Sequence, residues 1–393
     1  MELNNPNSDV VVLVGGGFAG LTTAMKLSAS KNRPKIILIE PKDRFVFSPF
    51  LYELLSGELE LWEIAPTYKS LVAEKGIILI QESVRTIDAF EQKVITMSGL
   101  EIKYSKVVLA TGSKPNDFGI PGVSDHALMF HSLLDIKLLK QLLNELSNCN
   151  EAMNQLVIVG AGATGVELAC KISDLVPDNI QIHLVEMGTS VLPHGKYFNK
   201  EQSEYALNSR GIRLHLQTQV IAISSNEVEL ESLVNNHSSR FSLPHRGLIW
   251  TAGFKAVYPE IIPQPTLIDD RISIDSYLNV RGMDNVLALG DISCDKKISS
   301  HPVSAQLAMQ QGVIAANNLI AFTEGKSQKL FKYKDFGEML SLGIGEGSIT
   351  ALGLTIAGPI AFQLRRMSYL TKIPNFSLGF RSAISWFLSP LKR

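Results

Sequence analysis

The sequence predicts an α/β protein, because one strand–helix–strand pattern occurs twice along the chain. In the first copy, the apolar run 10–14 leads into a glycine-rich turn, a helical stretch over residues 21–30, and a second apolar run over 36–39 that ends at Glu40. Continuous β-branched runs are typical of strands buried on both faces of a parallel sheet. The first copy therefore predicts two parallel strands connected by a helix.

The second copy repeats this order. Strand residues 156–159 lead into a glycine-rich turn and a helix over 166–175, and a further strand ends at Glu186. A unit of about 30 residues with an acid after its second strand indicates a dinucleotide site. Its first glycine permits a tight turn, its second lets the backbone approach a pyrophosphate, and its third lets the helix pack on the strand. We therefore predict two Rossmann-like dinucleotide-binding domains, with phosphates at the helix N-termini and with Glu40 and Glu186 accepting hydrogen bonds from ribose hydroxyls.

Three further strands end in small residues, where the backbone can approach a ligand. Residues 106–113 end in Ala-Thr-Gly-Ser, residues 247–253 in Thr-Ala-Gly, and residues 286–291 in Gly-Asp. Alternating apolar and polar residues over 82–97 and 219–231 predict two antiparallel hairpins. These segments fit the same α/β architecture.

The composition argues against several other classes of protein. The 393 residues suffice for two to three domains, and 37 Lys and Arg against 38 Asp and Glu leave a net charge of -1, so we expect no nucleic-acid partner. The three cysteines, Cys149, Cys170 and Cys294, lie far apart, so we expect neither disulfides nor a metal site. The N-terminus lacks an apolar signal region, and glycine and proline interrupt the uncharged stretch 348–364, so we expect neither secretion nor a spanning helix.

Together, the two turns and the Ala-Thr-Gly and Gly-Asp segments resemble the two-dinucleotide-binding-domain flavoproteins built like glutathione reductase. The likeness covers roughly residues 10–320. In that family the first turn holds FAD, and the second domain, which is inserted in the first, holds NAD(P)H. The resemblance implies an FAD domain over residues 1–120 and 275–335, an NAD(P)H domain over 121–274, and a C-terminal segment over 336–393.

The resemblance also assigns cofactor-binding residues, and it implies that the carboxylate of the Gly-Asp segment binds a ribityl hydroxyl of FAD. The FAD residues are Gly15, Gly17, Phe18, Ala19, Gly20, Glu40, Pro41, Val84, Thr111, Gly112, Gly290, Asp291, Ala305 and Gln306. The NAD(P)H residues are Gly160, Gly162, Ala163, Thr164, Gly165, Glu186, Ala252 and Gly253.

The electron acceptor needs separate evidence, because one fold serves several acceptors. Family members that reduce disulfides need a cysteine pair beside the flavin, which this chain lacks, and Cys170 is expected to be a small buried residue of a helix. The segment 305–312, Ala-Gln-Leu-Ala-Met-Gln-Gln-Gly, resembles the AQxAxQQ signature of the type II NAD(P)H:quinone oxidoreductases. We expect Ser304 to cap a helix that runs to about Ile320.

Four polar side chains are candidates for catalysis. Gln306, Gln310 and Gln311 lie on neighbouring parts of one helix surface, where neutral amides can orient quinone carbonyls. A solvated polar helix face is the alternative explanation. The resemblance places Glu167 near nicotinamide and flavin, although an acid favoured by the dipole in a first helical turn explains it equally well. The aromatic segment 45–52 resembles the family's segment near the acceptor tunnel.

The C-terminal segment is basic and aromatic. The chain has no Asp or Glu after Glu346, and its net charge there is +6, from Arg365, Arg366, Lys372, Arg381, Lys392 and Arg393. A helical spacing of apolar residues is formed by Phe380, Ile384, Phe387, Leu388 and Leu391. An apolar face beside cations is typical of a helix that lies on an anionic bilayer, so we expect a membrane-associating segment. Packing on the body of the protein or in a homodimer is the alternative.

We therefore interpret the chain as a peripheral membrane flavoenzyme of the type II NAD(P)H:quinone oxidoreductase family, on the cytoplasmic face of a plasma or thylakoid membrane. It looks most like the cyanobacterial and plastid branch, which includes demethylphylloquinone reductases and suggests a plasto-, mena- or demethylphylloquinone-type acceptor. Glu186 would repel the 2′-phosphate of NADPH, whereas the plastid branch is associated with NADPH, so the choice of nucleotide stays open. A reductase of a ferredoxin-like protein and a redox sensor of the apoptosis-inducing-factor type are the alternatives.

Overall fold

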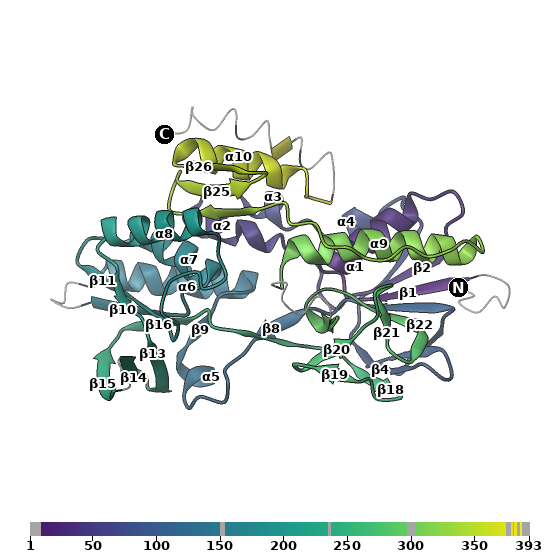
Figure 1. Cartoon of the computed structure of the whole chain (residues 1–393), viewed down its shortest axis with the longest axis horizontal. Coiled ribbons are helices and arrows are strands. Elements are labelled where there is room, and N and C mark those ends of the chain that lie inside the picture. Colours follow the sequence, from purple (N-terminus) through teal and green to yellow (C-terminus); the bar gives the residue numbers. More distant parts are fainter. Residues whose placement is uncertain are drawn as a thin grey trace. The chain divides into compact units, whose positions relative to one another are not determined.

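The computed structural model describes residues 9–149, 154–234, 237–296 and 303–374, together with Gly379, Arg381, Ser382 and Trp386. The chain divides into two compact units, whose elements are labelled in Figure 1. The first unit comprises Met1–Val46, Ala65–Lys114 and Lys255–Lys334. The second comprises Phe47–Ile64, Pro115–Phe254 and Asp335–Arg393.

These units differ from the expected domains. Residues 47–64 and the C-terminal segment group with the second unit, and residues 255–274 group with the first. The reason is packing, because helix α2 (Leu51–Ser56) and strand β24 (Glu338–Ser341) both contact helix α7 (Ala163–Ser173). Such contacts leave no local pattern in the sequence. The assignment of FAD and NAD(P)H to the two domains stays a prediction.

The first unit is built on a six-stranded sheet with the order β21–β22–β7–β1–β2–β3. Central strand β1 pairs in parallel with β2 and β7, which confirms the first strand–helix–strand unit. Helix α1 begins at Phe18, directly after the glycine-rich turn, rather than at residue 21. Helix α9 packs on α1 and is capped by Ser304, as expected. The bounds are β1 Val10–Val14, α1 Phe18–Ser28, β2 Lys35–Ile39, β3 Ile77–Ile80, β7 Lys106–Leu109, β21 Asn279–Val280, β22 Met283–Ala288 and α9 Ala305–Thr323.

Two smaller sheets complete the first unit, with the orders β18–β4–β5–β6 and β19–β20–β23. Strands β4 and β5 are antiparallel, which confirms the hairpin expected over residues 82–97. The bounds are α4 Tyr68–Val72, β4 Val84–Asp88, β5 Lys93–Thr96, β6 Glu101–Lys103, β18 Glu260–Ile262, β19 Leu267–Ile268, β20 Arg271–Ser273, the short 3-10 helix η2 Gly290–Ile292 and β23 Ser293–Cys294.

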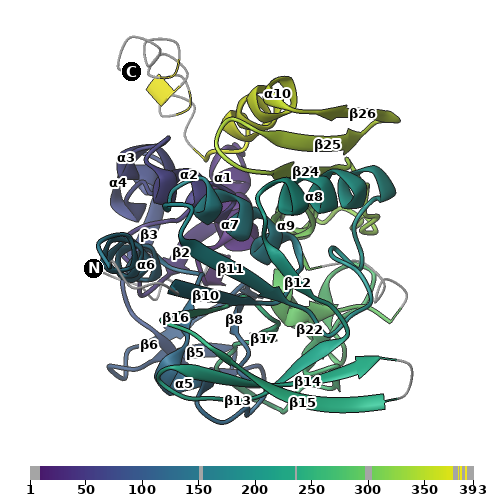
Figure 2. The ribbon, with the colours of Figure 1, turned by 90° about the vertical axis from the view of Figure 1, so that its left-hand side faces the viewer.

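The second unit is built on a parallel five-stranded sheet with the order β12–β11–β10–β16–β9 (Figure 2). Its centre confirms the second strand–helix–strand unit, and Cys170 is buried in α7 as expected. Antiparallel strands β13 and β14 confirm the hairpin expected over residues 219–231. The bounds are α5 Val123–His126, β9 Leu128–Met129, α6 Leu133–Ser147, β10 Asn154–Val159, β11 Ile180–Val185, α8 Tyr197–Ser209, β12 Arg213–His215, β13 Thr218–Ile223, β14 Glu227–Val234, β15 His237–Pro244 and β16 Gly247–Trp250.

A C-terminal module of three antiparallel strands and a helix also belongs to the second unit. Helix α10 contacts β24, β25 and β26, and β25 contacts α8 (Figures 1 and 2). Every helix among the described residues is too short or too polar to span a bilayer. The apolar positions expected to form a helix over 380–391 lie outside the described residues. The bounds of the module are β25 Gly347–Ala351, β26 Leu354–Ala357 and α10 Pro359–Leu370, together with β24 given above.

Two short helices of the second unit remain, η1 Ser48–Phe50 and α3 Leu61–Ile64.

The chain passes between the units through β8 (Ser113–Pro115) and β17 (Phe254–Ala256), which pair with each other. In both large sheets, the glycine-rich turns follow the carboxyl ends of the central strands β1 and β10. This edge is where open α/β sheets bind their ligands.

Candidate functional site

The first glycine-rich turn combines crowded glycines with an open one. Gly15 has a φ of +99°, and a Cβ atom added at Gly20 would lie 1.9 Å from the carbonyl oxygen of Gly15. The fold therefore needs glycine at both positions. Gly17 is exposed, and the nearest heavy atom to an added Cβ is 4.0 Å away. The open glycine leaves the backbone accessible to a ligand.

The second turn has the same arrangement. Gly160 has a φ of +98°, and a Cβ atom added at Gly165 would lie 1.8 Å from the carbonyl oxygen of Gly160. Gly162 is exposed, and an added Cβ would meet nothing within 4 Å. Thr251 Oγ1 donates to the carbonyl oxygens of Val159 and Gly160, which holds this turn against the end of β16. Ala252 and Gly253 follow directly, at the same sheet edge.

The helices after both turns begin without a side-chain cap. Gly17 and Gly162 are the N-cap residues of α1 and α7, and neither has a side chain that could accept a hydrogen bond from the first helical turn. By contrast, Ser132 caps α6 and Ser304 caps α9. Uncapped amides at the positive end of a helix dipole suit a phosphate.

The two acids expected at the ribose positions are held in matching ways. Glu40 accepts from the backbone N–H groups of Gly16 and Lys42 at 2.7 and 3.0 Å. Glu186 accepts from those of Ala161 and Gly188, both at 2.7 Å. One carboxylate offers about four acceptor positions, so each acid has capacity left for a ribose hydroxyl. Their contact with nucleotide stays a prediction.

The remaining residues assigned to FAD lie mostly at the carboxyl ends of β1, β7 and β22. Asp291 accepts a hydrogen bond from Ser113 Oγ at 2.6 Å, which ties the end of β22 to β8 after β7. Ala19 packs near Gly290, and Phe18 is half-buried against Phe45 with 5.3 Å between ring centroids. Pro41 is exposed after β2, whereas Thr111, Gly112 and Ala305 are half-buried, and Val84 lies apart in β4 of a separate sheet. Tyr68 donates to the carbonyl oxygen of Gly16 at 2.8 Å, a contact that the sequence pattern did not predict.

The three glutamines do not share one open surface. Gln311 is buried, and its amide oxygen accepts from the backbone N–H of Gly290 at 2.6 Å. Gln310 exchanges hydrogen bonds with the backbone of Lys334. Gln306 is half-buried in the first turn of α9. Two of the amides therefore hold loops of the first unit in place, and the expected quinone contacts stay a prediction.

Glu167 belongs to a buried charge cluster in the second unit. It accepts from the backbone N–H of Ser341 at 2.7 Å and lies 3.3 Å from Nη2 of Arg365 on α10. Arg365, which is 1% exposed, also pairs with Glu53 on α2 and donates to the carbonyl oxygen of Pro49 at 2.7 Å. One guanidinium thus faces two carboxylates in a dry environment.

Burial makes Glu167 a weaker acid than an exposed glutamate. Desolvation raises its pKa to about 7, although Arg365 and the Ser341 amide act in the opposite direction. Burial, with the charge of Glu167, also raises the pKa of Tyr52. Glu167 lies beyond the first turn of α7, so an acid favoured there by the helix dipole does not explain it. A carboxyl group with this pKa can exchange a proton at neutral pH.

A second buried ion pair joins the same elements. Lys171 of α7 is fully buried, pairs with Glu58, and donates to the carbonyl oxygen of Gly343 at 2.9 Å. Its ammonium group lies 5.4 Å from the ring centroid of Phe362 on α10. Buried charges are tolerated only when paired in this way. The C-terminal module therefore contacts α7 through ion pairs and hydrogen bonds as well as through apolar packing.

The structure corrects the prediction that all six cations of the C-terminal segment serve a lipid surface. Arg365 is buried in its ion pairs, and Arg366 stacks on Trp386 with 4.1 Å from the guanidinium to the ring centroid. Lys372 and Arg381 are exposed, and the last two cations lie outside the described residues. The pattern failed because a buried arginine and an exposed one look alike in a sequence.

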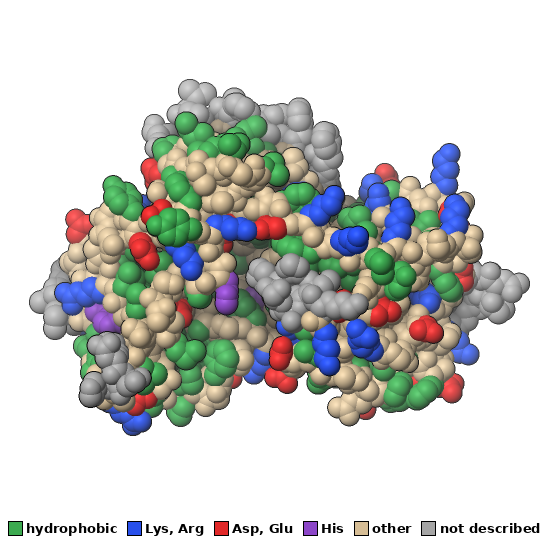
Figure 3. Space-filling model, viewed as in Figure 1, with side chains coloured by type: hydrophobic (Ala, Val, Ile, Leu, Met, Phe, Trp, Pro, Cys, Tyr) green, Lys and Arg blue, Asp and Glu red, His purple; other side chains and the backbone are tan. Residues whose placement is uncertain are grey.

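The C-terminal module presents an exposed apolar face. Ile360, Leu364 and Met367 follow helical spacing on α10 and are 68%, 42% and 58% exposed. Leu352, in the turn from β25 to β26, and Leu354, the first residue of β26, are exposed as well. Figure 3 shows hydrophobic side chains gathered on this part of the second unit. We name these five residues the α10 face.

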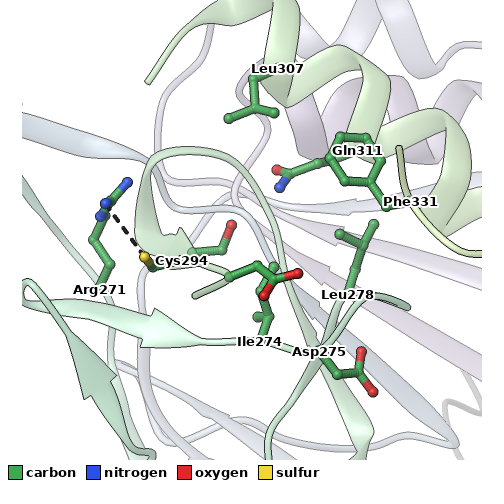
Figure 4. A pocket seen from close by; sticks show the side chains of 10 residues that line it. Arg271, Ile274, Asp275, Leu278, Cys294, Leu307, Gln311 and Phe331 are labelled. Carbon is green, nitrogen blue, oxygen red and sulfur yellow. Dashed lines mark hydrogen bonds between the residues drawn. The ribbon is translucent and has the colours of Figure 1, made fainter. Parts of the chain in front are cut away.

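A small cavity in the first unit lies among Arg271, Cys294 and side chains of α9, as Figure 4 shows. Its volume of about 20 Å³ accommodates one water molecule. Arg271 Nη2 lies 3.5 Å from the Cys294 sulfur on its wall. The cavity is too small for a nucleotide or a quinone.

Known proteins resemble this chain over nearly its whole length. Residues 9–312 match the family model described as pyridine nucleotide-disulphide oxidoreductase. The demethylphylloquinone reductase NdbB of Synechocystis sp. is 33% identical over 97% of this chain and 96% of that protein. The alternative NAD(P)H-ubiquinone oxidoreductase C1, chloroplastic/mitochondrial, of Arabidopsis thaliana is 30% identical over 96% of this chain and 80% of that protein. The structure of NDH2 from Plasmodium falciparum in complex with NADH has the same fold, with a TM-score of 0.86, 16% identity and 98% coverage of both chains.

Proposed function

Because the chain belongs to the pyridine nucleotide-disulphide oxidoreductase family and, within it, to the type II NAD(P)H:quinone oxidoreductases, we propose that it transfers electrons from NAD(P)H through FAD to a quinone. The observation that carries the proposal is the pair of glycine-rich turns. Both have an open middle glycine and an uncapped helix, and both hold an acid on the backbone of the turn.

FAD fits the first turn. Gly17 and the N-terminus of α1 would bind its pyrophosphate, Glu40 its adenosine ribose, and Asp291 a ribityl hydroxyl. FAD, when bound, supplies the hydride and electron chemistry, and the protein supplies binding and orientation. Gln311 supports this site indirectly, because it fixes the backbone N–H of Gly290 beside Asp291. Gln306 remains the residue that we propose to face the acceptor, because the amide of Gln310 already bonds the backbone of Lys334.

NAD(P)H fits the second turn, where Gly162 and the N-terminus of α7 would bind the pyrophosphate and Glu186 the adenosine ribose. Reduction of a quinone to a quinol consumes protons as well as electrons. We assign proton exchange to Glu167, because burial raises its pKa to about 7, so that the carboxyl group can gain or lose a proton at neutral pH.

The acceptor that we propose is a quinone of the demethylphylloquinone type, because the Synechocystis relative is a demethylphylloquinone reductase. We further propose that the enzyme works at a membrane surface, on its cytoplasmic side. The α10 face supplies the apolar contact with the bilayer, and Lys372 and Arg381 supply the cations that favour anionic lipid.

Stopped-flow absorbance tests the proposed reaction. The purified protein is mixed with NADH or NADPH to follow bleaching of the flavin band, and the reduced enzyme is then mixed with menaquinone, plastoquinone and demethylnaphthoquinone analogues. We expect rapid bleaching and rapid reoxidation by at least one quinone. Reoxidation by an iron–sulfur protein but by no quinone would support the ferredoxin-type alternative. Slow bleaching that leaves bound nicotinamide would support a redox sensor.

A further inference from the structure

Phe118, in the second unit, has a backbone conformation that bulky residues rarely adopt. Its φ is +51°, in the left-handed region, where a Cβ atom crowds the neighbouring carbonyl group. The residue is 60% exposed, so burial of its ring does not offset the strain. Residues that the surrounding structure holds in such a conformation cluster at functional sites.

Hydrogen bonds within the loop and to the segment after β16 fix the loop that carries Phe118. Asn116 Oδ1 accepts from the backbone N–H of Phe118 at 3.0 Å, and the backbone N–H of Asn116 donates to the carbonyl oxygen of Gly253 at 3.2 Å. The indole N–H of Trp250 lies 2.8 Å from the carbonyl oxygen of Asn116 and 2.9 Å from that of Ala252. The loop is thus bound to the Thr-Ala-Gly turn after β16.

These bonds set the ring of Phe118 directly on Gly253. A Cβ atom added at Gly253 would lie 2.4 Å from the tip of the ring, and Gly253 itself has a φ of +66°. Two further aromatic residues follow the ends of β9 and β16 in the chain. His131 and Phe254, which follow β9 and β16, have ring centroids 5.9 Å apart, and Phe254 is 47% exposed. Flat, partly exposed rings therefore gather at the carboxyl ends of β16 and β9.

The order of strands identifies which half of a dinucleotide would meet these rings. In the sheet, β10 lies between β11 and β16. The acid after β11 marks the adenosine end, and the open glycine after β10 marks the pyrophosphate. A nucleotide that follows this edge brings its nicotinamide half to the end of β16, where Gly253 and Phe118 lie.

We propose that Phe118 is a contact residue for the nicotinamide half of NAD(P)H, an inference that rests on the proposed function of the second turn. Its ring forms a wall beside Gly253 on which the planar nicotinamide–ribose half packs. The Asn116 and Trp250 hydrogen bonds hold the loop in the strained conformation that presents the ring.

The test compares two ligands on three variants of the full-length enzyme. Calorimetric titration measures binding of NAD⁺ and of ADP, which lacks the nicotinamide half, to Phe118→Gly, Gly162→Ala and the control Gln92→Gly. Gln92 has a φ of +50° in the turn between β4 and β5 of the first unit, so its variant relieves the same kind of strain away from the second site.

We expect Phe118→Gly to bind NAD⁺ roughly tenfold more weakly, as for loss of an aromatic stacking contact, with unchanged affinity for ADP. Its melting temperature should stay constant or rise by about 1–3 °C, because glycine relaxes the left-handed backbone. Gly162→Ala should weaken both ligands, and Gln92→Gly neither.

Unchanged NAD⁺ affinity in Phe118→Gly, when Gly162→Ala weakens both ligands, would overturn the role of Phe118 and leave the nucleotide site intact. Equal weakening of NAD⁺ and ADP, or a melting temperature lowered by more than about 5 °C, would overturn it as well, because either result assigns the ring to the fold. If Gly162→Ala weakened neither ligand, the proposed nucleotide site itself would be wrong.

Discussion

Alanine at Gly17 should yield a folded protein that lacks flavin. The change adds one methyl group at the open position of the first turn, where the nearest heavy atom is 4.0 Å away and the backbone φ is -66°. Alanine adopts this conformation without strain, so the fold tolerates the substitution. The added methyl group occupies the space through which a pyrophosphate reaches the backbone of the turn and α1.

The expected effect on folding is small, whereas the effect on binding is large. Replacing an N-cap glycine by alanine costs less than about 1 kcal/mol, and the lower entropy of the unfolded chain returns about 0.4–1 kcal/mol. A hydrogen bond to a charged phosphate contributes about 1.5–3 kcal/mol, so losing two of them lowers FAD affinity by roughly 10²- to 10⁴-fold.

The assay compares the ratio of flavin to protein absorbance with the circular dichroism of the purified variants. Gly17→Ala should be colourless with a native far-ultraviolet spectrum. Gly20→Ala is the matched control, because its methyl group would lie 1.9 Å from the carbonyl oxygen of Gly15 and should prevent folding. A Gly17→Ala protein as yellow as the parent would refute the assignment of this turn to FAD.

Three further experiments test the buried cluster and the α10 face. Arg365→Gln leaves two buried carboxylates without their cation, so it should lower the free energy of unfolding, measured by urea denaturation, by about 3–5 kcal/mol. The double variant Arg365→Gln with Glu53→Gln should recover part of this loss. If it recovers none, the ion pair between Arg365 and Glu53 is contradicted. The pKa of Glu167 is about 7 in the folded protein, against an ordinary value of 4.5. Between pH 4.5 and pH 7, unfolding therefore releases a proton from this carboxyl group. The stability that Glu167 contributes falls as the pH rises through this range. Glu167→Gln should flatten that part of the stability profile, and an unaltered slope would exclude a raised pKa. The double variant Ile360→Asp with Leu364→Asp should no longer co-sediment with anionic vesicles, whereas its reduction of a water-soluble quinone should be unchanged. If the variant still sediments with the vesicles as the parent protein does, the α10 face does not contact lipid.

The parts of the fold that sequence reasoning found are local. Each strand–helix–strand unit extends over about 30 consecutive residues, and its period, glycines and final acid are all readable within that window. The cap at Ser304 and the two hairpins are equally local, and all three are present. Helices α1 and α7 begin at Phe18 and Ala163, three residues before the predicted starts, because each glycine turn leads into its helix without a break.

The parts that sequence reasoning missed depend on residues that are remote in the chain. Arg365 lies 312 positions from Glu53 and 198 from Glu167, and such a separation leaves no periodic signal. Read along the chain, the cations after Glu346 indicated a lipid surface, whereas packing buries one of them and stacks another on an indole. The strain at Phe118 is equally invisible in the sequence, because its cause is a set of hydrogen bonds to the turn after β16.

Local order in the chain was thus enough to identify two nucleotide-binding units and the family to which they point, since a phosphate-binding turn is made of neighbouring residues. The partner of each buried charge, the exposed face of α10 and the ring on Gly253 emerged from packing. Burial and charge pairing depend on distance in space, and distance along the chain does not encode them.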